Sequence, residues 1–324
     1  MSQGELLGPD PAPAPLGRRR NVRIGLCSWS DPSLIKSKAF YPRGCSSAEA
    51  RLRFYATQFP IVEVDSSFYA LPSPANSLLW AQRTPSDFVF NVKAFRLLTG
   101  HQTPPAVLPA DIAAALPPLP ARKKNWYYDD VPAELRDELW RRFIAALAPL
   151  REAGRLLAVH FQFAPWATNG AKWRAHVEHC VERMAGHLLA VEFRNASWYG
   201  EGRAEQTLAW QRELGVAHTI VDEPQDVGNF AHGVWAVTNP KLAVVRLHGR
   251  NADTWDAKGL AASSDRFNYE YEDAELDDLA RRIDRIVDDA LDVVVLLNVN
   301  YEDQGVRAAQ SLMARMQRAG PPTA

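Results

Sequence analysis

Eight short runs of apolar, often β-branched residues recur along the chain, and longer stretches with helical spacing separate them. Near-continuous apolar runs are typical of parallel strands that are covered on both faces. The runs that we predict to be strands are residues 22–27, 61–65, 88–92, 156–161, 188–193, 217–221, 242–247 and 293–297. Because strand and helix alternate throughout, the pattern predicts the α/β class, and eight repeats predict a closed (β/α)8 or TIM barrel.

Apolar residues at helical spacing mark the segments between these runs. The predicted helices are residues 132–148, 172–185, 204–214, 274–290 and 304–317. Two further helix starts carry local signals. Residues 46–49, Ser-Ser-Ala-Glu, form a capping-box pattern, and Ser73 before Pro74 predicts an N-cap followed by proline in the first helical position.

Two segments fall outside the alternation of strands and helices. Residues 1–20 are rich in proline and end in three arginines, so we predict a disordered tail before a single barrel domain over residues 21–318. Residues 99–131, after the third strand, contain six prolines and a Trp-Tyr-Tyr triplet. A connection of this length is a loop that covers the barrel rim or a specific lid over the site.

The predicted strands end in polar residues, although a strand covered on both faces should be apolar throughout. Most of these residues are spaced i, i+2, so both side chains of a pair face the same way. The polar residues are Glu63 and Asp65, Asn91 and Lys93, His160 and Gln162, Glu192 and Arg194, Asp222, Arg246 and His248, and Asn298. Buried charges are costly unless they meet partners, so we expect this set to converge at the C-terminal mouth of the barrel, where barrel enzymes hold their sites.

Each member of the candidate site is assigned a role by its chemistry. The candidate catalytic residues are Glu192, Asp222 and His248, because carboxylates and imidazole transfer protons. The candidate ligand-binding residues are Trp29, Glu63, Asp65, Tyr69, Lys93, Arg96, Gln162, Arg194, Trp198, Arg246, Arg250 and Asn298. An alternative remains open, in which pairs such as Glu192 with Arg194 are structural ion pairs.

Aromatic residues follow the strand ends as well: Trp29, Phe68, Tyr69, Trp166 and Trp198. Rings in these positions pack on the barrel rim or stack against a sugar or a base, and the sequence leaves both possibilities open.

Charge and cysteine content narrow the range of partners and compartments. The formal net charge of −1 gives no global basic field that would attract nucleic acid. Cys27, Cys45 and Cys180 are too few and too widely spaced for a disulfide framework or a metal knuckle, which predicts reduced thiols in a cytoplasm. No stretch approaches the roughly 20 apolar residues of a membrane span, so we expect no membrane partner.

No cofactor is predicted. The chain has no GxGxxG or Walker A pattern, so a nucleotide cofactor is not indicated. His160, Glu192, Asp222 and His248 have the chemistry of metal ligands, but no compact ligand spacing supports them, and no metal is assigned.

The motifs at the strand ends, taken in order, resemble the domain of unknown function 72 family, also called YecE-like. The resemblance runs from Ile24 to about Leu312. The segments that carry it are 24–29, 40–42, 62–69, 90–94 with Arg96 and Thr99, 161–163, 190–194 with Ser197 and Trp198, Asp222 with Pro224, 246–250, and Asn298. The resemblance implies a barrel similar to those of endonuclease IV and xylose isomerase, and it implies no settled reaction.

The chain departs from the family pattern at three positions. Asp65 stands where the family usually has asparagine, Ala164 where proline is usual, and Val299 interrupts the usual Asn-Asn pair. The proline-rich insert at 99–131 is also longer than usual. These departures predict a shifted substrate or activity in this member.

Three functions are compatible with the predicted site. The first is a hydrolase or binder that acts on a phosphate-bearing ligand, nucleic acid being one such ligand, with Lys93, Arg96, Arg194, Arg246 and Arg250 holding phosphate. In that case Arg194 would keep Glu192 ionised beside His248, although the net charge disfavours long duplex contacts. The second is a sugar or polyol hydrolase or isomerase. The third is a non-catalytic ligand-binding module.

Overall fold

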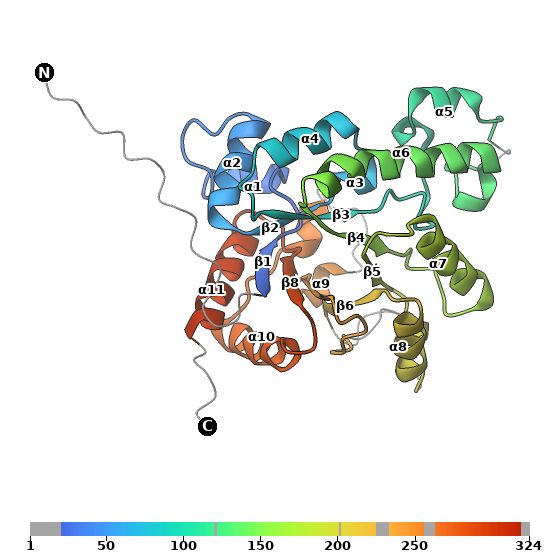
Figure 1. The fold of residues 1–324 in the computed structure, drawn as a ribbon. Coiled ribbons are helices and arrows are strands. Elements are labelled where there is room, and N and C mark those ends of the chain that lie inside the picture. The colour runs from blue at the N-terminus through green and yellow to red at the C-terminus, as the bar shows by residue number, and fades with distance from the viewer. Residues whose placement is uncertain (1–20, 120–121, 201, 225–232, 256–262, 319–324) are drawn as a thin grey trace, which may run out of the picture.

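Eight parallel strands pair in sequence order and close into a barrel, with β1 hydrogen-bonded to β8 (Figure 1). The structure is a computed structural model, which describes residues 21–119, 122–200, 202–224, 233–255 and 263–318. The strands are β1 Val22–Leu26, β2 Ile61–Val64, β3 Val89–Lys93, β4 Leu156–Gln162, β5 Leu189–Glu192, β6 Ala217–Asp222, β7 Leu242–Leu247 and β8 Asp292–Leu297. The predicted TIM barrel is confirmed, and every strand end lies within one residue of its predicted position.

The helices lie around the barrel, as Figure 1 shows for the long ones. They are α1 Pro32–Ser37, α2 Ala48–Gln58, α3 Ser66–Tyr69, α4 Pro74–Gln82, α5 Ala110–Ala115, α6 Ala133–Glu152, α7 Ala171–Arg183, α8 Ala204–Glu213, α9 Ala252–Trp255, α10 Asp273–Ile286 and α11 Gln304–Arg318. The 3-10 turns of the described residues are η1 Pro105–Val107, η2 Tyr128–Asp130, η3 Ala196–Trp198 and η4 Ser263–Phe267. In the part of the chain that the structure describes, no helix combines the length and apolarity of a membrane span.

The starts of α2 and α4 test the two capping predictions. Ser73 caps α4 as predicted, and its Oγ accepts from the backbone N–H of Asn76 at 3.2 Å. The capping box predicted at 46–49 is wrong by one residue, because Ser47 is the N-cap of α2. Glu49 then lies one position too early to reach back to the cap, and it pairs instead with Arg53 at 2.9 Å.

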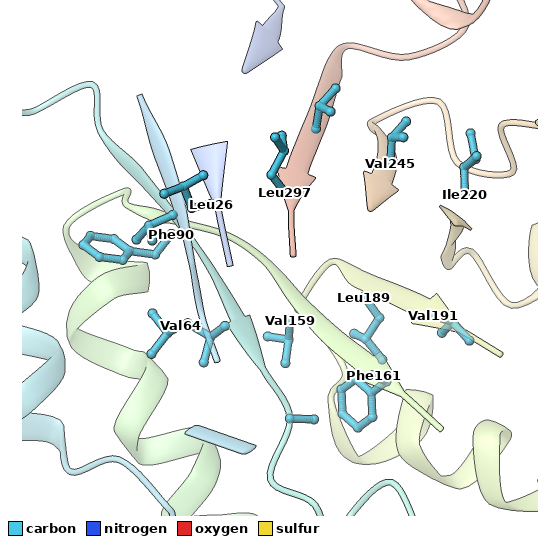
Figure 2. Packing of buried hydrophobic residues seen from close by; sticks show 14 of the residues in the cluster. Leu26, Val64, Phe90, Val159, Phe161, Leu189, Val191, Ile220, Val245 and Leu297 are labelled. Carbon is cyan, nitrogen blue, oxygen red and sulfur yellow. The ribbon is translucent and has the colours of Figure 1, made fainter. Parts of the chain in front are cut away.

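The barrel strands separate two apolar layers. The larger outer layer lies between strands and helices, and Figure 2 shows part of it along the strands, including Val64, Val159 and Val245. The smaller inner layer includes Ala158, Ala190, Ala217, Val244 and Leu296. The other members are Cys27, Ile61, Leu242 and Val294, so alanines and branched side chains together fill the interior.

The proline-rich insert is folded against the barrel rim where it is described. Thr103 and Trp126 form an antiparallel bridge, with backbone N–O distances of 2.8 and 2.9 Å. Tyr128 accepts from the indole N–H of Trp140 on α6 at 2.8 Å and contacts Nε2 of His179 on α7 at 2.7 Å. These contacts fix the insert to two outer helices. The predicted tail, residues 1–20, lies outside the described residues.

Candidate functional site at the barrel mouth

Arg246 of β7 lies inside the barrel between two carboxylates. Its Nη2 is 2.7 Å from Oε1 of Glu63 on β2, and its Nη1 is 2.7 Å from Oε2 of Glu192 on β5. These three strands are not neighbours in the sheet, so the contacts cross the barrel interior. All three side chains are fully buried.

Two further side chains complete what we call the interior network, which consists of Glu63, Asn91, His160, Glu192 and Arg246. Asn91 donates to Oε2 of Glu63 at 2.9 Å. The His160 ring lies between the carboxylates, with Nδ1 3.0 Å from Glu63 and Nε2 3.4 Å from Glu192. Arg246 also approaches Gln162 at 3.4 Å. Four neighbouring strands and β7 therefore contribute to one polar layer above the inner apolar layer.

The charges of the interior network hold one another ionised. Burial alone would raise the pKa values of Glu63 and Glu192, but the guanidinium of Arg246 and the hydrogen bonds from His160 lower both well below the ordinary range. Burial would lower the pKa of Arg246, and the two carboxylates raise it well above its usual value. Fully buried and doubly paired, Arg246 and Glu192 present no open face to a ligand. The predicted roles of Arg246 in ligand binding and of Glu192 in catalysis stay predictions, and the structure places both side chains in the barrel interior.

A second polar layer lies nearer the strand ends. Arg194 is 3.1 Å from Glu192 and 3.2 Å from Glu223, and its Nη1 is 3.4 Å from Nε2 of His248. Asn298 donates to Nδ1 of His248 at 2.9 Å. Burial, opposed by the charge of Glu192 and reinforced by Arg246 and Arg194, lowers the pKa of His248 well below its usual value. The predicted convergence of Arg194, His248 and Asn298 is what the structure shows.

The prediction that Asp222 joins the converging set is wrong. In the register of the sheet, Asp222 pairs with Leu247, which belongs to the outer apolar layer, whereas Val221 pairs with the inward-facing Arg246. The Asp222 carboxylate instead accepts from Arg250 at 2.7 Å and from the hydroxyl of Tyr271 at 2.8 Å. Asp222 is thus committed to an ion pair on the outer side of its strand.

Glu223 takes the place that was assigned to Asp222. It is nearly fully buried and lies beside Arg194. Burial, opposed by Arg194 and helped by the charges of Glu192 and Asp222, raises its pKa to about 7. The spacing of Thr219, Val221 and Glu223 carries the signal that would have found it, because period-2 alternation places all three on the inner face.

Arg250, which was predicted to bind a ligand, is paired with acidic residues of the chain. Its guanidinium bonds both oxygens of Asp222 and lies 2.9 Å from Glu275 on α10. Its predicted role in holding phosphate would require breaking these bonds. Arg250 therefore ties β6 to α10, and it is not a free cation of the mouth.

Lys93 and Asp65 form the edge of the site beside β2 and β3. Lys93 Nζ is 2.7 Å from Asp65 and 4.6 Å from the centre of the Phe68 ring. Burial lowers the pKa of Lys93, but the Asp65 charge outweighs it and raises the value. The acidic residue that departs from the family pattern thus neutralises a buried lysine.

Aromatic rings extend from this edge along the rim, and we call Phe68, Tyr69, His101 and Trp166 the rim arc. Ring centres are 5.1 Å apart for Phe68 and Tyr69, 4.9 Å for Phe68 and His101, and 5.8 Å for His101 and Trp166. Tyr69 is 51 % exposed and Trp166 is 45 % exposed, so both offer open ring faces. His101 was not predicted, since a histidine in a proline-rich loop carries no periodic signal.

Arg96 lies against the rim arc. Its guanidinium carbon is 5.4 Å from the centre of the Phe68 ring, and its Nε is buried with no hydrogen-bond partner. Among the ion pairs of the described residues, none includes Arg96. Partial burial lowers the pKa of Arg96. Arg96 is therefore a cation of the mouth whose charge is not neutralised by a carboxylate.

Two aromatic residues assigned to the ligand pack in the core. Trp198 is fully buried, stacks on Phe193 with ring centres 3.7 Å apart, and donates to the carbonyl of Ala167 at 2.7 Å. Trp29 is buried against Trp80, with ring centres 5.9 Å apart. Both rings point toward the helices and not toward the barrel axis, so the structure does not bring them to the candidate site.

A cavity of about 260 Å³ opens beside the β1 and β8 ends, and its lining includes Cys27, Asp31, Asp65, Tyr69 and Asn298. Asn300 also borders it and donates to Asp31 at 3.1 Å. Cys27 lies 3.5 Å from Arg246, and burial raises the pKa of its thiol. Within the described ranges, no three His, Cys, Asp or Glu side chains are placed to hold a metal ion.

Comparison with known proteins agrees with this architecture. Residues 23–323 match the family described as "Protein of unknown function DUF72". The chain belongs to the DUF72 family. The UPF0759 protein YunF of Bacillus subtilis (strain 168) is 31 % identical to this DUF72 chain over 281 residues, which are 86 % of this chain and 89 % of that protein.

Two solved structures resemble the DUF72 chain in fold. The crystal structure of a DUF72 family protein from Enterococcus faecalis V583 has a TM-score of 0.74 and 25 % identity, covering 93 % of this chain and 97 % of that one. A DUF72 family protein from Thermotoga maritima MSB8 has a TM-score of 0.70 and 24 % identity, covering 92 % and 99 %. The family description assigns no reaction, so the site itself must carry the functional argument.

Proposed function

We propose that the barrel mouth binds a small phosphate-bearing ligand with an aromatic base, that is, a nucleotide. The observation that carries the proposal is Arg96, a cation without a carboxylate partner held against the rim arc. A guanidinium binds phosphate through charge-assisted hydrogen bonds, and exposed rings such as Trp166 stack on a base. Among the described residues of the mouth, Lys93, Arg194, Arg246 and Arg250 are each paired with an acid, so Arg96 is the cation we assign to a small ligand with one phosphate.

We further propose that the protein hydrolyses a phosphate ester of the bound ligand. Of the buried carboxylates, Glu223 is the one whose pKa is raised to about 7, which suits a group that exchanges protons near neutral pH. His248 lies in the same layer, since both residues contact Arg194. We therefore expect the Glu223→Gln variant to lose hydrolytic turnover and to keep its affinity for the ligand.

Calorimetric titration with dAMP, adenosine and inorganic phosphate tests the binding proposal. We expect dAMP to bind more tightly than adenosine, and Arg96→Ala to weaken dAMP about 10- to 100-fold while leaving adenosine unchanged. Arg53→Ala is the matched control, because Arg53 is an exposed arginine on α2. Equal affinity for dAMP and adenosine, or an Arg96→Ala variant that binds dAMP normally, would contradict the proposal.

A neutral sugar is the second candidate, favoured by the cavity of about 260 Å³. Asp31, Asp65 and Asn298 offer hydrogen-bonding groups there, and Tyr69 offers an exposed ring. A pentose or hexose that binds with unchanged affinity in Arg96→Ala, in the absence of any dAMP binding, would favour this candidate.

A further inference from the structure

A second cavity lies outside the barrel axis, between the insert and the outer helices α6 and α7. It has a volume of about 740 Å³, within the range of small-molecule sites. Its lining includes Tyr127, Tyr128, Trp166 and Trp173. We call it the insert cavity. Of its lining, Trp166 alone was given a role at the mouth above.

The insert cavity joins the rim arc through one shared residue. Trp166 belongs to the rim arc and also lines the insert cavity. Beyond it, Tyr127 lies with its ring centre 6.3 Å from that of Trp166 and is 38 % exposed. Aromatic rings therefore continue from the mouth into the insert cavity.

The charged side chains that line the insert cavity are balanced in number: they are Lys123, Arg136 and Lys172 against Asp129, Asp130 and Asp137. Lys172 is paired with Asp129 at 2.7 Å, and Lys123 with Asp130 at 2.7 Å. The first pair is exposed, so water screens it and a ligand phosphate can exchange with the carboxylate. Arg136 lies over the Tyr128 ring at 5.0 Å, and no ion pair among the described residues includes it.

We propose that the insert cavity is a second base-binding subsite, so that the ligand of the mouth is a short single-stranded nucleic acid of at least two nucleotides. The inference rests on the proposed nucleotide site at the mouth. One base stacks on the rim arc with its phosphate at Arg96, and the next base enters the insert cavity beside Tyr127. Stacking on rings tolerates any base, and Lys172 and Arg136 face the connecting backbone charge. A net charge of −1 suits such a short contact better than a long duplex.

The test compares dAMP, the dinucleotide d(pApA), and the same dinucleotide without its second base, titrated into the full chain. We expect d(pApA) to bind at least about tenfold more tightly than either of the others, the scale of one stacked base. Tyr127→Ala should remove that gain and leave dAMP affinity unchanged, whereas Tyr127→Phe should keep the gain. Leu291→Ala is the control, because Leu291 is exposed and immediately precedes β8, at the opposite end of the strands.

The outcomes separate this inference from the proposal on which it rests. If dAMP binds but d(pApA) binds no more tightly, the insert cavity is not a subsite and the mouth site stands. If the gain survives in a folded Tyr127→Ala protein, the second base lies elsewhere and the inference is overturned. If neither dAMP nor d(pApA) binds, both proposals fall. Thermal unfolding of each variant shows whether it is folded.

Discussion

Arg246 in the barrel interior and Arg96 at the barrel mouth are two guanidinium groups in opposite settings. Arg246 is fully buried and lies 2.7 Å from each of two carboxylates. Arg96 is partly exposed, lies against an aromatic ring, and belongs to no ion pair among the described residues. The Nε of each guanidinium is buried without a hydrogen-bond partner, so the ion pairs and not this atom distinguish the two. Polar residues near the strand ends therefore divide into those that pair with one another and those left for a ligand.

The largest effect is expected from breaking the interior network. Arg246→Met leaves Glu63 and Glu192 buried without their cation, and we expect a loss of about 5 kcal/mol in the free energy of unfolding. Arg96→Met should change that free energy by less than about 0.5 kcal/mol. Urea unfolding followed by tryptophan fluorescence measures both. Similar losses in the two variants would show that Arg246 in the interior and Arg96 at the mouth contribute equally to stability.

The triple variant Glu63→Gln, Glu192→Gln, Arg246→Met sharpens this prediction. Removing the charges together avoids unpaired buried ions, so most of the stability lost in Arg246→Met should return. A triple variant no more stable than the single one would show that the loss comes from packing and not from charge.

The aromatic residues provide the next largest contrast. Trp198→Ala removes a fully buried ring stacked on Phe193, so we expect a loss of about 3–5 kcal/mol. Trp166→Ala removes an exposed ring of the rim arc and should cost less than about 0.5 kcal/mol while weakening nucleotide binding. If Trp198 is purely structural, the folded fraction of Trp198→Ala should bind the nucleotide as tightly as wild type does. Weaker binding by the folded fraction would contradict this.

A smaller effect is expected from His218, a buried neutral group in β6. It accepts from Tyr199 at 3.0 Å and donates to the carbonyl of Val234 at 2.9 Å, and burial lowers its pKa to about 4. An unfolded histidine titrates near pH 6.5, so between pH 6.5 and 4 the unfolded state binds more protons and stability falls as pH falls. At pH 5 the loss from this residue is about 2 kcal/mol.

Unfolding of wild type and His218→Gln at pH 8 and pH 5 measures this effect. The difference at pH 8 reports packing alone, and by pH 5 it should have shifted by about 2 kcal/mol in favour of the variant. Glu223 acts with the opposite sign, since its raised pKa of about 7 makes the folded state hold a proton that the unfolded state releases. It is common to both proteins and cancels. A difference that stays constant with pH would refute the assignment.

The smallest effect concerns Asp222. Asp222→Asn keeps the shape but removes the charge that faces Arg250, and we expect a loss of about 1 kcal/mol because Arg250 is partly exposed. Affinity for dAMP should not change. If Asp222→Asn weakens dAMP binding without lowering the free energy of unfolding, Asp222 belongs to the ligand site.

The sequence was sufficient to predict the strands and most of the interior network. Apolar runs locate the strands, and the i, i+2 spacing places Glu63, Glu192 and Arg246 on one face. Asp222 was misassigned because it and Glu223 are adjacent acids at a strand end, and only the register with Leu247 shows which one faces inward. A shift of one residue reverses the face of every side chain, so this choice depends on the paired strand.

The direction of a side chain beyond a strand end was not predictable from the sequence. Trp166 and Trp198 both follow strands, yet one is exposed and the other is fully buried. Trp198 lies in a 3-10 turn that carries its ring onto Phe193 and α8, a tertiary contact without a local signal. The position of His101 and the presence of the insert cavity were not predictable for the same reason, because both depend on how the insert folds against α6 and α7.

The pairing of β1 with β8 has a consequence for folding during synthesis on the ribosome. Asn21 bonds the carbonyl of Val287 across 266 positions of sequence, and Val22 pairs with Val293. At about 5–20 residues per second of ribosomal synthesis, the first strand waits roughly 15–50 s for its last neighbour. During that time one edge of an apolar strand is open to any other chain, so the nascent barrel is most vulnerable to aggregation until its final strand leaves the ribosome.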